Sequence, residues 1–274
     1  MTMPDPSAGG GYVLGTGSHG SERLHVVAHI CEPATRWLLD RAGIEPGMRV
    51  VDVGCGIGTV TALLAERVGP SGSVVGVDVN QDQLEIARGL AAERGLANVE
   101  FAAGDAAATR LERGTFDVAY SRFVLMHLRD PAGALREMTG LLADEGLLVC
   151  EEADSSRWWA WPPAPGLRRM WKLFEALSTA RGQDWQIGPK LPGLLRAAGV
   201  PNPGVSVVQP AFLDGPGKRL PLLNLREGGE HFAEAGLVER EELEELRREL
   251  EALSLDGDAL VTAGMVVQAW GRPG

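Results

Sequence analysis

The feature that most constrains the fold is a short apolar run that contains one acidic residue and is followed by three alternating glycines. Residues 50–53 read Val-Val-Asp-Val, and Gly54, Gly56 and Gly58 follow at every second position. Glycine lacks a Cβ atom, so it tolerates backbone conformations that other residues resist and lets a ligand approach the chain closely. From Thr59 the sequence is able to begin a helix. The pattern therefore predicts a buried strand, a tight turn and a helix, with a small polar cofactor at the turn.

The spacing of these glycines distinguishes between two kinds of nucleotide cofactor. A dinucleotide site uses G-x-G-x-x-G and places the pyrophosphate on the helix N-terminus. Here the third glycine comes only two residues after Gly56, and position 59 is Thr. Asp52 lies just before the turn, where its charge would repel a pyrophosphate but suit a cation or an amino group. These features argue against the alternative of an NAD(P)-dependent oxidoreductase.

Two further apolar runs end in acids. Residues 73–77 lead to Asp78, whose carboxylate can accept hydrogen bonds from both hydroxyls of a ribose. Residues 98–101 lead to Gly104, Asp105 and Ala106, which place a polar side chain where an adenine would lie. Strands that alternate with helices predict a parallel sheet covered on both faces, with the ligand beyond the carboxyl ends of the strands.

Residues 47–152 resemble the class I S-adenosylmethionine-dependent methyltransferases of the small-molecule type. Five motifs occur in that family's order, at residues 51–58, 75–78, 103–106, 116–120 and 142–149. The resemblance implies an α/β fold with a doubly wound, seven-stranded, mostly parallel sheet, a Rossmann-like methyltransferase fold whose last strand is antiparallel. It also implies S-adenosylmethionine as the cofactor and S-adenosylhomocysteine as the product.

The same resemblance implies roles for individual residues. The glycine turn and Asp52 would hold the methionine part of the cofactor, Asp78 the ribose hydroxyls and Asp105 the adenine amino group. N-terminal arms in resembling proteins often close over the cofactor. We therefore expect Tyr12 to contact the cofactor and His19 to lie beside the acceptor. The expected cofactor-binding residues are Tyr12, Asp52, Gly54, Cys55, Gly56, Gly58, Asp78, Val79, Gln83, Gly104, Asp105, Ala106, Ser121 and Arg122.

We expect one methyltransferase domain over residues 1–274. Its parts are an N-terminal arm with helices (1–45), the cofactor-binding core (47–152), cap insertions (155–187 and 217–255) and the last strand (264–270). Ser21 is expected to start a first helix and Pro33 a second one that ends at Gly43. Asn80 with Gln83, and Asp130 before a proline, are expected to start two of the core helices. The predicted helices of the core and caps span residues 59–68, 81–94, 131–143, 166–181 and 239–253.

The residues facing the methyl acceptor are less determined. His127 follows the fourth strand and is either a general base or a histidine that only packs. Five of the seven tryptophans fall within residues 158–185, and they form either a lid over an aromatic acceptor or the packing between an insertion and the sheet. We take the lid as the expectation, with Trp158, Trp159 and Trp161 facing the acceptor. Glu151 and Glu152 end the fifth strand, where one faces the acceptor or both are solvated.

Composition excludes several partners. A formal net charge of −11 argues against binding to a nucleic acid backbone, which needs clustered Lys and Arg. Three isolated cysteines form no C-x-x-C pair, so we expect no metal site and a reducing cytoplasm. The first 20 residues do not resemble a signal peptide, and no apolar stretch is long enough to span a membrane. A monomer or homodimer that acts on a small-molecule acceptor is the expected form.

The expected function is methyl transfer from S-adenosylmethionine to a small organic acceptor, such as a natural product or other secondary metabolite. Oxygen is the first choice for the methylated atom, and nitrogen or carbon stays open. Some proteins that resemble methyltransferases use the bound sulfonium for a cyclisation or another rearrangement, and no residue separates that alternative. A cofactor-sensing or interaction protein is a further alternative from a non-enzyme class.

Overall fold

The computed structural model describes residues 18–274 of the chain, with side chains from Glu22 onward. Its centre is a seven-stranded sheet with the strand order β3-β2-β1-β4-β5-β10-β7. Strand β10 pairs antiparallel with both of its neighbours, while the pairs formed by β1 to β5 are parallel. The predicted seven-stranded, mostly parallel sheet with an antiparallel last strand is therefore confirmed. The seven strands are β1 (Arg49–Val53), β2 (Ser73–Asp78), β3 (Val99–Ala103), β4 (Phe116–Arg122), β5 (Leu142–Asp154), β7 (Gly204–Val208) and β10 (Met265–Gly271).

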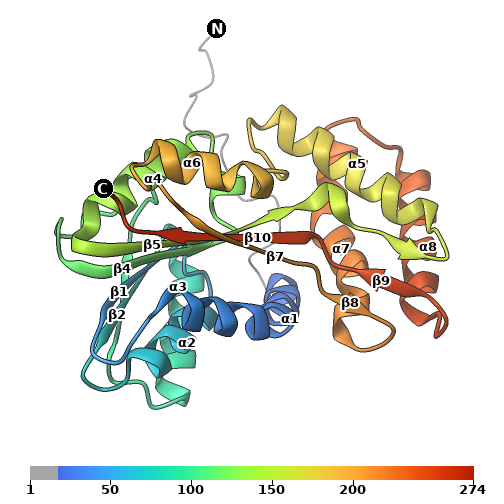
Figure 1. Ribbon diagram of the computed structural model, residues 1–274. Coiled ribbons are helices and arrows are strands. Elements are labelled where there is room, and N and C mark those ends of the chain that lie inside the picture. The colour runs from blue at the N-terminus through green and yellow to red at the C-terminus, as the bar shows by residue number, and fades with distance from the viewer. Residues whose placement is uncertain (1–17) are drawn as a thin grey trace, which may run out of the picture.

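Helices cover both faces of this sheet (Figure 1). On one face lie α1 (Ser18–Ala42), α2 (Thr59–Val68) and α3 (Gln81–Glu93), and on the other lie α4 (Pro131–Leu141) and α6 (Leu191–Ala197). One apolar cluster joins Leu38 and Leu39 of α1 to Leu64 of α2 and the sheet. A second joins Leu135 of α4 and Leu191 of α6 to the opposite face. The sheet is thus buried on both sides, which explains why its strands read as continuous apolar runs.

Two predicted helix starts are confirmed by their side-chain caps. The Asn80 side chain accepts a hydrogen bond from the Gln83 backbone N–H at 3.1 Å, and α3 begins one residue after Asn80. The Asp130 side chain accepts one from the Gly133 N–H at 2.9 Å, with Pro131 at the first position of α4. Each cap satisfies an N–H group that the first turn of a helix leaves without a partner.

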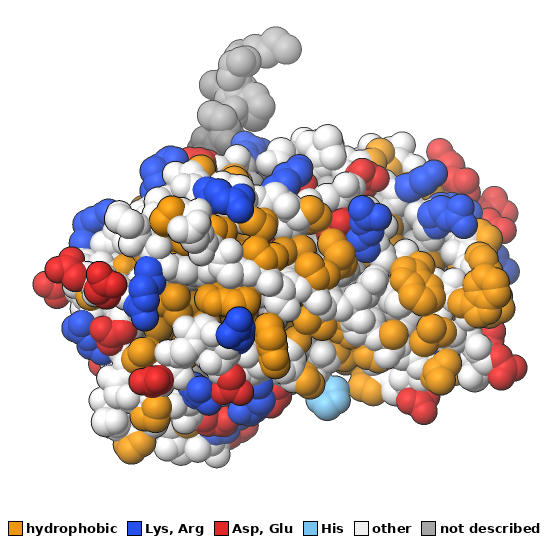
Figure 2. Space-filling model, in the orientation of Figure 1, with side chains coloured by type: hydrophobic (Ala, Val, Ile, Leu, Met, Phe, Trp, Pro, Cys, Tyr) orange, Lys and Arg blue, Asp and Glu red, His pale blue; other side chains and the backbone are white. Residues whose placement is uncertain are grey.

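The cap groups at one end of the sheet (Figure 1) and contains helices α5 (Pro165–Ala180), α7 (Leu220–Glu234) and α8 (Arg240–Leu255). Short 3-10 turns connect the elements at η2 (Leu125–His127), η3 (Ser155–Arg157), η4 (Gly188–Lys190) and η5 (Pro216–Arg219). Helix α8 buries Leu243, Leu246 and Leu250 and exposes its acidic residues. Figure 2 shows acidic side chains gathered at this end of the molecule. The amphipathic helix expected over residues 239–253 is confirmed.

One local prediction was wrong, and one element of the fold was not predicted. Pro33 was expected to start a second helix, but α1 is continuous from Ser18 to Ala42 with Pro33 inside it. The reason is tertiary packing, because Cys31 and Thr35 on either side of Pro33 are both buried and Thr35 is hydrogen-bonded to β5. A second sheet was not anticipated, in which β6 (Ala160–Trp161), β9 (Leu260–Thr262) and β8 (Ala211–Phe212) pair antiparallel in that order.

Within residues 18–274, no helix is both long enough and apolar enough to cross a bilayer.

Candidate functional site

A cavity of about 570 Å³ lies beyond the carboxyl ends of the central strands, where the glycine turn follows β1. Its volume falls within the range of about 300–1,000 Å³ that small-molecule sites occupy. Eleven of the expected cofactor-binding residues line it, from the turn after β1 and the ends of β2, β3 and β4. They are Asp52, Gly54, Cys55, Gly56, Asp78, Val79, Gln83, Gly104, Asp105, Ala106 and Arg122.

Close contacts and positive φ angles shape the glycine turn, most tightly at Gly54. Gly54 has φ +76°, and a Cβ atom added there would lie 2.3 Å from Cγ2 of Val124. Gly56 has φ +54° and would bring a Cβ atom 3.3 Å from Oε1 of Gln83. Both φ angles belong to the left-handed region that favours glycine. The turn is therefore a bare stretch of backbone on the cavity wall, as a closely held cofactor requires.

Asp52 is a buried acid at the start of this turn. Its side chain accepts a hydrogen bond from Oγ1 of Thr61 at 2.7 Å, and it is 2% exposed. Burial raises the pKa of the Asp52 carboxyl from 3.8 to about 6, while Thr61 and the Arg122 guanidinium lower it. A carboxylate with so little water around it interacts strongly with a cation that enters the cavity.

Asp78 connects the end of β2 to the glycine turn. Its Oδ2 atom accepts the N–H of Gly56 at 2.9 Å, and its Oδ1 atom accepts the N–H of Asn80 at 2.9 Å. Each carboxylate oxygen has a second lone pair, so two hydroxyls of a ribose can still be accommodated. Asp105 is held in the same way, because its Oδ1 atom accepts the N–H of Ala107 at 2.7 Å.

The end of β4 brings a buried cation and a strained backbone to the cavity. Arg122 donates from Nη1 to Oγ1 of Thr35 at 3.1 Å, and its guanidinium lies 5.7 Å from the ring centre of Phe123. Interactions with Tyr120, Cys31, Glu151 and Asp52 raise the pKa of Arg122 against the lowering effect of burial. Phe123 has φ +56°, which is uncommon for a bulky residue and recurs at functional sites.

Glu151 and Glu152 are both completely buried, so the idea that they are solvated at a strand end is wrong. Glu151 accepts hydrogen bonds from the Tyr120 hydroxyl, from Thr35 Oγ1 at 2.8 Å and from Gln268 Nε2 at 2.8 Å. It thereby joins α1 to the sheet. Glu152 accepts the backbone N–H groups of residues 124, 125 and 126 at 3.0, 2.7 and 3.3 Å. It positions the turn that packs against Gly54.

Apolar side chains make up the half of the cavity that faces the cap. One side is formed by α1, through Leu24, Val27 and Ile30, with Leu220 of α7 beside them. Another part of the lining is aromatic. Three tryptophans line it, namely Trp158, Trp171 and Trp185. This half offers an apolar surface with aromatic rings, and the acidic residues Asp52, Asp78 and Asp105 line the other half, which we call the cofactor half.

His127 also lies on the cavity wall. Its ring meets Trp185 edge to face with ring centres 5.4 Å apart. Burial lowers the pKa of His127 from 6.5 to about 3, with a further contribution from the Arg23 cation, so the ring is neutral near pH 7. A base with so low a pKa is a weak proton acceptor at that pH.

Several expected site residues do not line the cavity. Gly58 caps the start of α2 and packs against Ala87, where an added Cβ would lie 2.8 Å from the alanine methyl. Ser121 is fully buried on the other side of β4, with its Oγ atom 3.5 Å from the Cys150 sulfur. Because side chains alternate along a strand, Ser121 points away from the side taken by Arg122.

The expectation for Trp159 and Trp161 is also corrected by the structure. These side chains are 46% and 67% exposed and lie outside the cavity lining. Ala160 between them is buried against the short sheet of β6, β9 and β8, so the two-residue alternation of an extended segment turns both rings outward. Trp158 alone of the three lines the cavity. Tyr12 and the side chain of His19 lie outside the described residues.

The sequence did not identify Trp171, Trp185, Gln183 and Asn224 as cavity residues. They come from α5, the loop after it and α7, at large distances along the chain from the motifs. A signal was present in Trp171, because it lies on the apolar face of the helix expected over residues 166–181. Nothing in the sequence places the loop at residues 181–187 against that helix.

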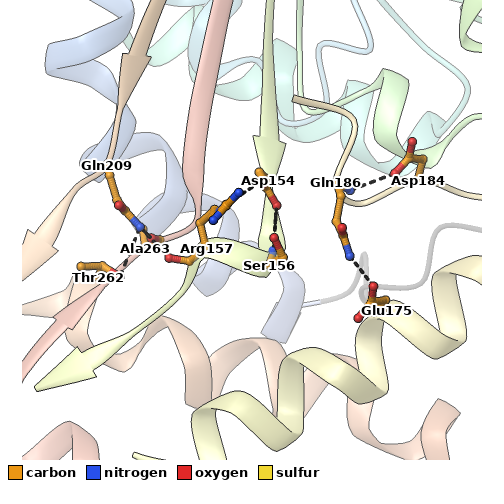
Figure 3. Close-up of polar contacts among 9 residues, drawn as sticks. All are labelled: Asp154, Ser156, Arg157, Glu175, Asp184, Gln186, Gln209, Thr262 and Ala263. Atoms are coloured by element: carbon orange, nitrogen blue, oxygen red, sulfur yellow. Dashed lines mark hydrogen bonds and ion pairs between the residues drawn. The ribbon is translucent and has the colours of Figure 1, made fainter. Parts of the chain in front are cut away.

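Polar contacts at the edge of the cap fix its loops in place (Figure 3). Gln186 donates from Nε2 to Glu175 of α5 and from its backbone N–H to Asp184 at 3.1 Å. On the neighbouring segment, Asp154 accepts hydrogen bonds from the Ser156 hydroxyl at 2.6 Å and from Arg157 Nε at 3.2 Å. Gln209 donates from Nε2 to the Ala263 carbonyl at 3.1 Å. These contacts hold the segments that carry Trp158 and Trp185.

The arrangement fits S-adenosylmethionine in its donor set and its shape. A Cβ atom at Gly54 or Gly56 would fill the space in which the cofactor can contact the backbone. Buried Asp52 offers a negative charge to a cationic group. Asp78 and Asp105 keep acceptor capacity for hydroxyl and amino groups. Among the described residues, no group of three His, Cys, Asp or Glu side chains is placed to hold a metal ion.

Comparisons with known proteins point in the same direction. The family described as "Methyltransferase domain" matches residues 44–186. A demethylmenaquinone methyltransferase of Lactococcus lactis is 38% identical over 136 residues, which is 50% of this chain and 52% of that protein. The nocamycin O-methyltransferase of Saccharothrix syringae is 40% identical over 134 residues, covering 48% of each chain. The chain therefore spans about half the length of these curated relatives.

Among solved structures, a Bacillus halodurans protein that carries a provisional assignment as a methyltransferase has the same fold. The two chains superpose with a TM-score of 0.59 and 19% sequence identity, over 86% of this chain and 97% of the other. At this level of identity the likeness concerns the fold alone. It extends over more of the chain than the residues that the family match covers.

Proposed function

The chain belongs to the methyltransferase-domain family of S-adenosylmethionine-dependent enzymes, and on this premise we propose that it transfers a methyl group from S-adenosylmethionine to a small organic acceptor. The observation that carries the proposal is the single cavity in which two chemically different halves meet. Acids and bare backbone line one half, and apolar and aromatic side chains line the other. Such a cavity can hold a charged cofactor and an apolar acceptor side by side.

When bound, the cofactor would supply a methyl group that is activated by its positively charged sulfur, and the sulfur would keep the bonding electron pair and leave as a neutral thioether. The protein must then align the two partners and exclude water. Alignment alone can lower a barrier by roughly 7–11 kcal/mol when the geometry is good. Asp52, Asp78 and Asp105 would orient the cofactor, and the aromatic wall would orient the acceptor. No strong general base is needed for an acceptor that arrives ionised.

The neutral His127 suits a packing role beside the acceptor better than strong base catalysis. Its edge contact with Trp185 and its lowered pKa support this assignment. We propose an oxygen nucleophile, for which the O-methyltransferase among the relatives is supporting evidence, and a natural product or related secondary metabolite as the acceptor class.

The test is mass spectrometry of small-molecule extracts incubated with the protein and methyl-labelled S-adenosylmethionine. The proposal expects a labelled product that has gained one CH₂ group, together with S-adenosylhomocysteine. A product formed without any mass change, and without consumption of the cofactor, would replace methyl transfer by a rearrangement on the same site. Reaction only with a nicotinamide cofactor would contradict the proposal altogether.

A further inference from the structure

The aromatic wall of the cavity separates it from a second cavity of about 330 Å³. Five residues line both spaces, namely Ser155, Trp158, Trp171, Gln183 and Trp185. The rings form a continuous series. Trp158 stacks on Trp171 with ring centres 4.7 Å apart, and Phe174 stacks on Trp185 at 5.2 Å. A layer one side chain thick therefore stands between the two cavities.

Three polar atoms inside this layer have no hydrogen-bond partner among the described residues. They are Nε1 of Trp171, Nε1 of Trp185 and Oε1 of Gln183. Trp185 and Gln183 are only 4% and 8% exposed, so water does not readily take the place of a partner. Gln183 donates from Nε2 to the His127 carbonyl at 3.2 Å, which fixes the direction of its amide and leaves Oε1 as the unpaired end. Buried polar groups are almost always paired, so three together in one layer require an explanation.

Polar contacts hold the segments that surround the layer. Gln186, Asp154 and Gln209 fasten the surrounding segments through the polar contacts of Figure 3. The indoles themselves contribute stacking but no hydrogen bond from Trp171 or Trp185 to the described residues. A ligand that parts the rings can therefore replace one aromatic contact by another and, in addition, pair the three polar atoms.

We propose that the methyl acceptor is a planar aromatic molecule that carries a carbonyl oxygen and, on a different part of the ring system, a hydroxyl group, and that it binds by parting this layer between the two cavities. This inference rests on the proposed function, because it assumes that the protein methylates a small acceptor. A carbonyl oxygen can accept a hydrogen bond from an indole N–H group, and a hydroxyl can donate to Oε1 of Gln183. A site built from such groups rejects an analogue of the same shape that lacks them, because its polar atoms then stay unpaired.

The experiment compares two probes of similar shape by calorimetry on the full chain saturated with S-adenosylhomocysteine. One is 6-acetyl-2-naphthol, whose carbonyl and hydroxyl lie on different rings and cannot bond to each other, and the other is 2-ethylnaphthalene, which has neither oxygen. We expect 6-acetyl-2-naphthol to bind at least tenfold more tightly. In W171F and W185F, which remove an N–H but keep a ring, its affinity should fall about fivefold or more, while 2-ethylnaphthalene changes less than twofold.

Matched controls are W159F and W161F, whose indoles are exposed and outside both cavities; neither should change the affinity of either probe. Equal affinity for the two probes, or an equal loss for both in W171F and W185F, would overturn the inference. Binding of S-adenosylhomocysteine is measured in the same samples. If it binds and the probes are not discriminated, only this inference fails; if it does not bind at all, the proposed function fails first.

Discussion

Oδ2 of Asp78 accepts a hydrogen bond from the backbone N–H of Gly56 at 2.9 Å, so the acid that ends the second strand holds the glycine turn that follows the first strand. Two motifs that lie 22 residues apart are joined by this contact on the wall of one cavity. The same carboxylate is the expected partner of the cofactor ribose. Its removal should therefore affect cofactor binding directly and through the turn.

The first prediction is that Asp78→Ala weakens S-adenosylhomocysteine binding at least tenfold, because two hydroxyl contacts and the support of Gly56 are lost together. Tenfold corresponds to about 1.4 kcal/mol. Calorimetric titration measures the change. Asp144→Ala is the control, since that side chain is exposed and outside the cavity lining. Undiminished affinity in the Asp78 variant would remove the ribose assignment.

A second prediction separates backbone strain from crowding at the glycine turn. Gly43 and Gly54 have nearly the same φ, +77° and +76°, but a Cβ atom at Gly43 meets nothing within 4 Å while one at Gly54 would collide with Val124. Gly43→Ala should cost about 1–2 kcal/mol of folding free energy from the φ angle alone and leave cofactor affinity unchanged. Gly54→Ala should also displace the Val124 turn and weaken cofactor binding.

Denaturant unfolding and calorimetry on both glycine variants give the two quantities. If Gly54→Ala is folded and binds S-adenosylhomocysteine as tightly as Gly43→Ala does, the close packing of the turn has no role in the site.

The third prediction concerns pH. The carboxyl of Asp52 has a pKa of about 6 in the folded chain, raised chiefly by burial. Only its ionised form attracts a cationic cofactor, so the affinity for S-adenosylmethionine should be constant well above pH 6 and fall as the pH drops through 6. Asp52→Asn should bind weakly at every pH and lose this step. A step of equal size in Asp52→Asn would assign the titration to another group.

The fourth prediction distinguishes the tryptophans. Trp158→Ala should reduce acceptor affinity and leave cofactor affinity within twofold, because Trp158 lines the half of the cavity that faces the cap. Trp161→Ala should change neither, because that ring is 67% exposed on the outer side of the short sheet. Steady-state kinetics with the acceptor found by mass spectrometry, together with cofactor titration, measure both. Loss of acceptor affinity in Trp161→Ala alone would contradict this placement.

The cofactor half of the site was predictable from sequence because its chemistry is local. Asp52, Gly54 and Gly56 are neighbours along the chain. Asp78, which is hydrogen-bonded to this turn, is the last residue of β2. The order of strands and helices follows from apolar runs that are long enough to show their period. Most of the expected residues therefore lie on the cavity wall.

The acceptor half was not predictable for a reason that the tryptophans illustrate. Whether a ring at position 158, 159 or 161 faces inward depends on the pairing of β6 with β9, and these strands have two and three residues. Such short strands carry too little alternation to be recognised. Trp171 and Trp185 meet only because the loop after α5 folds back onto it, which is a tertiary contact. The sequence also did not predict that α1 continues through Pro33, because that continuity depends on tertiary contacts of Cys31 and Thr35.

The most direct test of the account is a calorimetric titration of the full chain with S-adenosylhomocysteine, followed by displacement with S-adenosylmethionine. The account predicts saturable binding at one site per chain, and competition between the two nucleosides for that site. Absence of binding by either nucleoside to the folded protein would contradict the assignment of the glycine cradle and its acids.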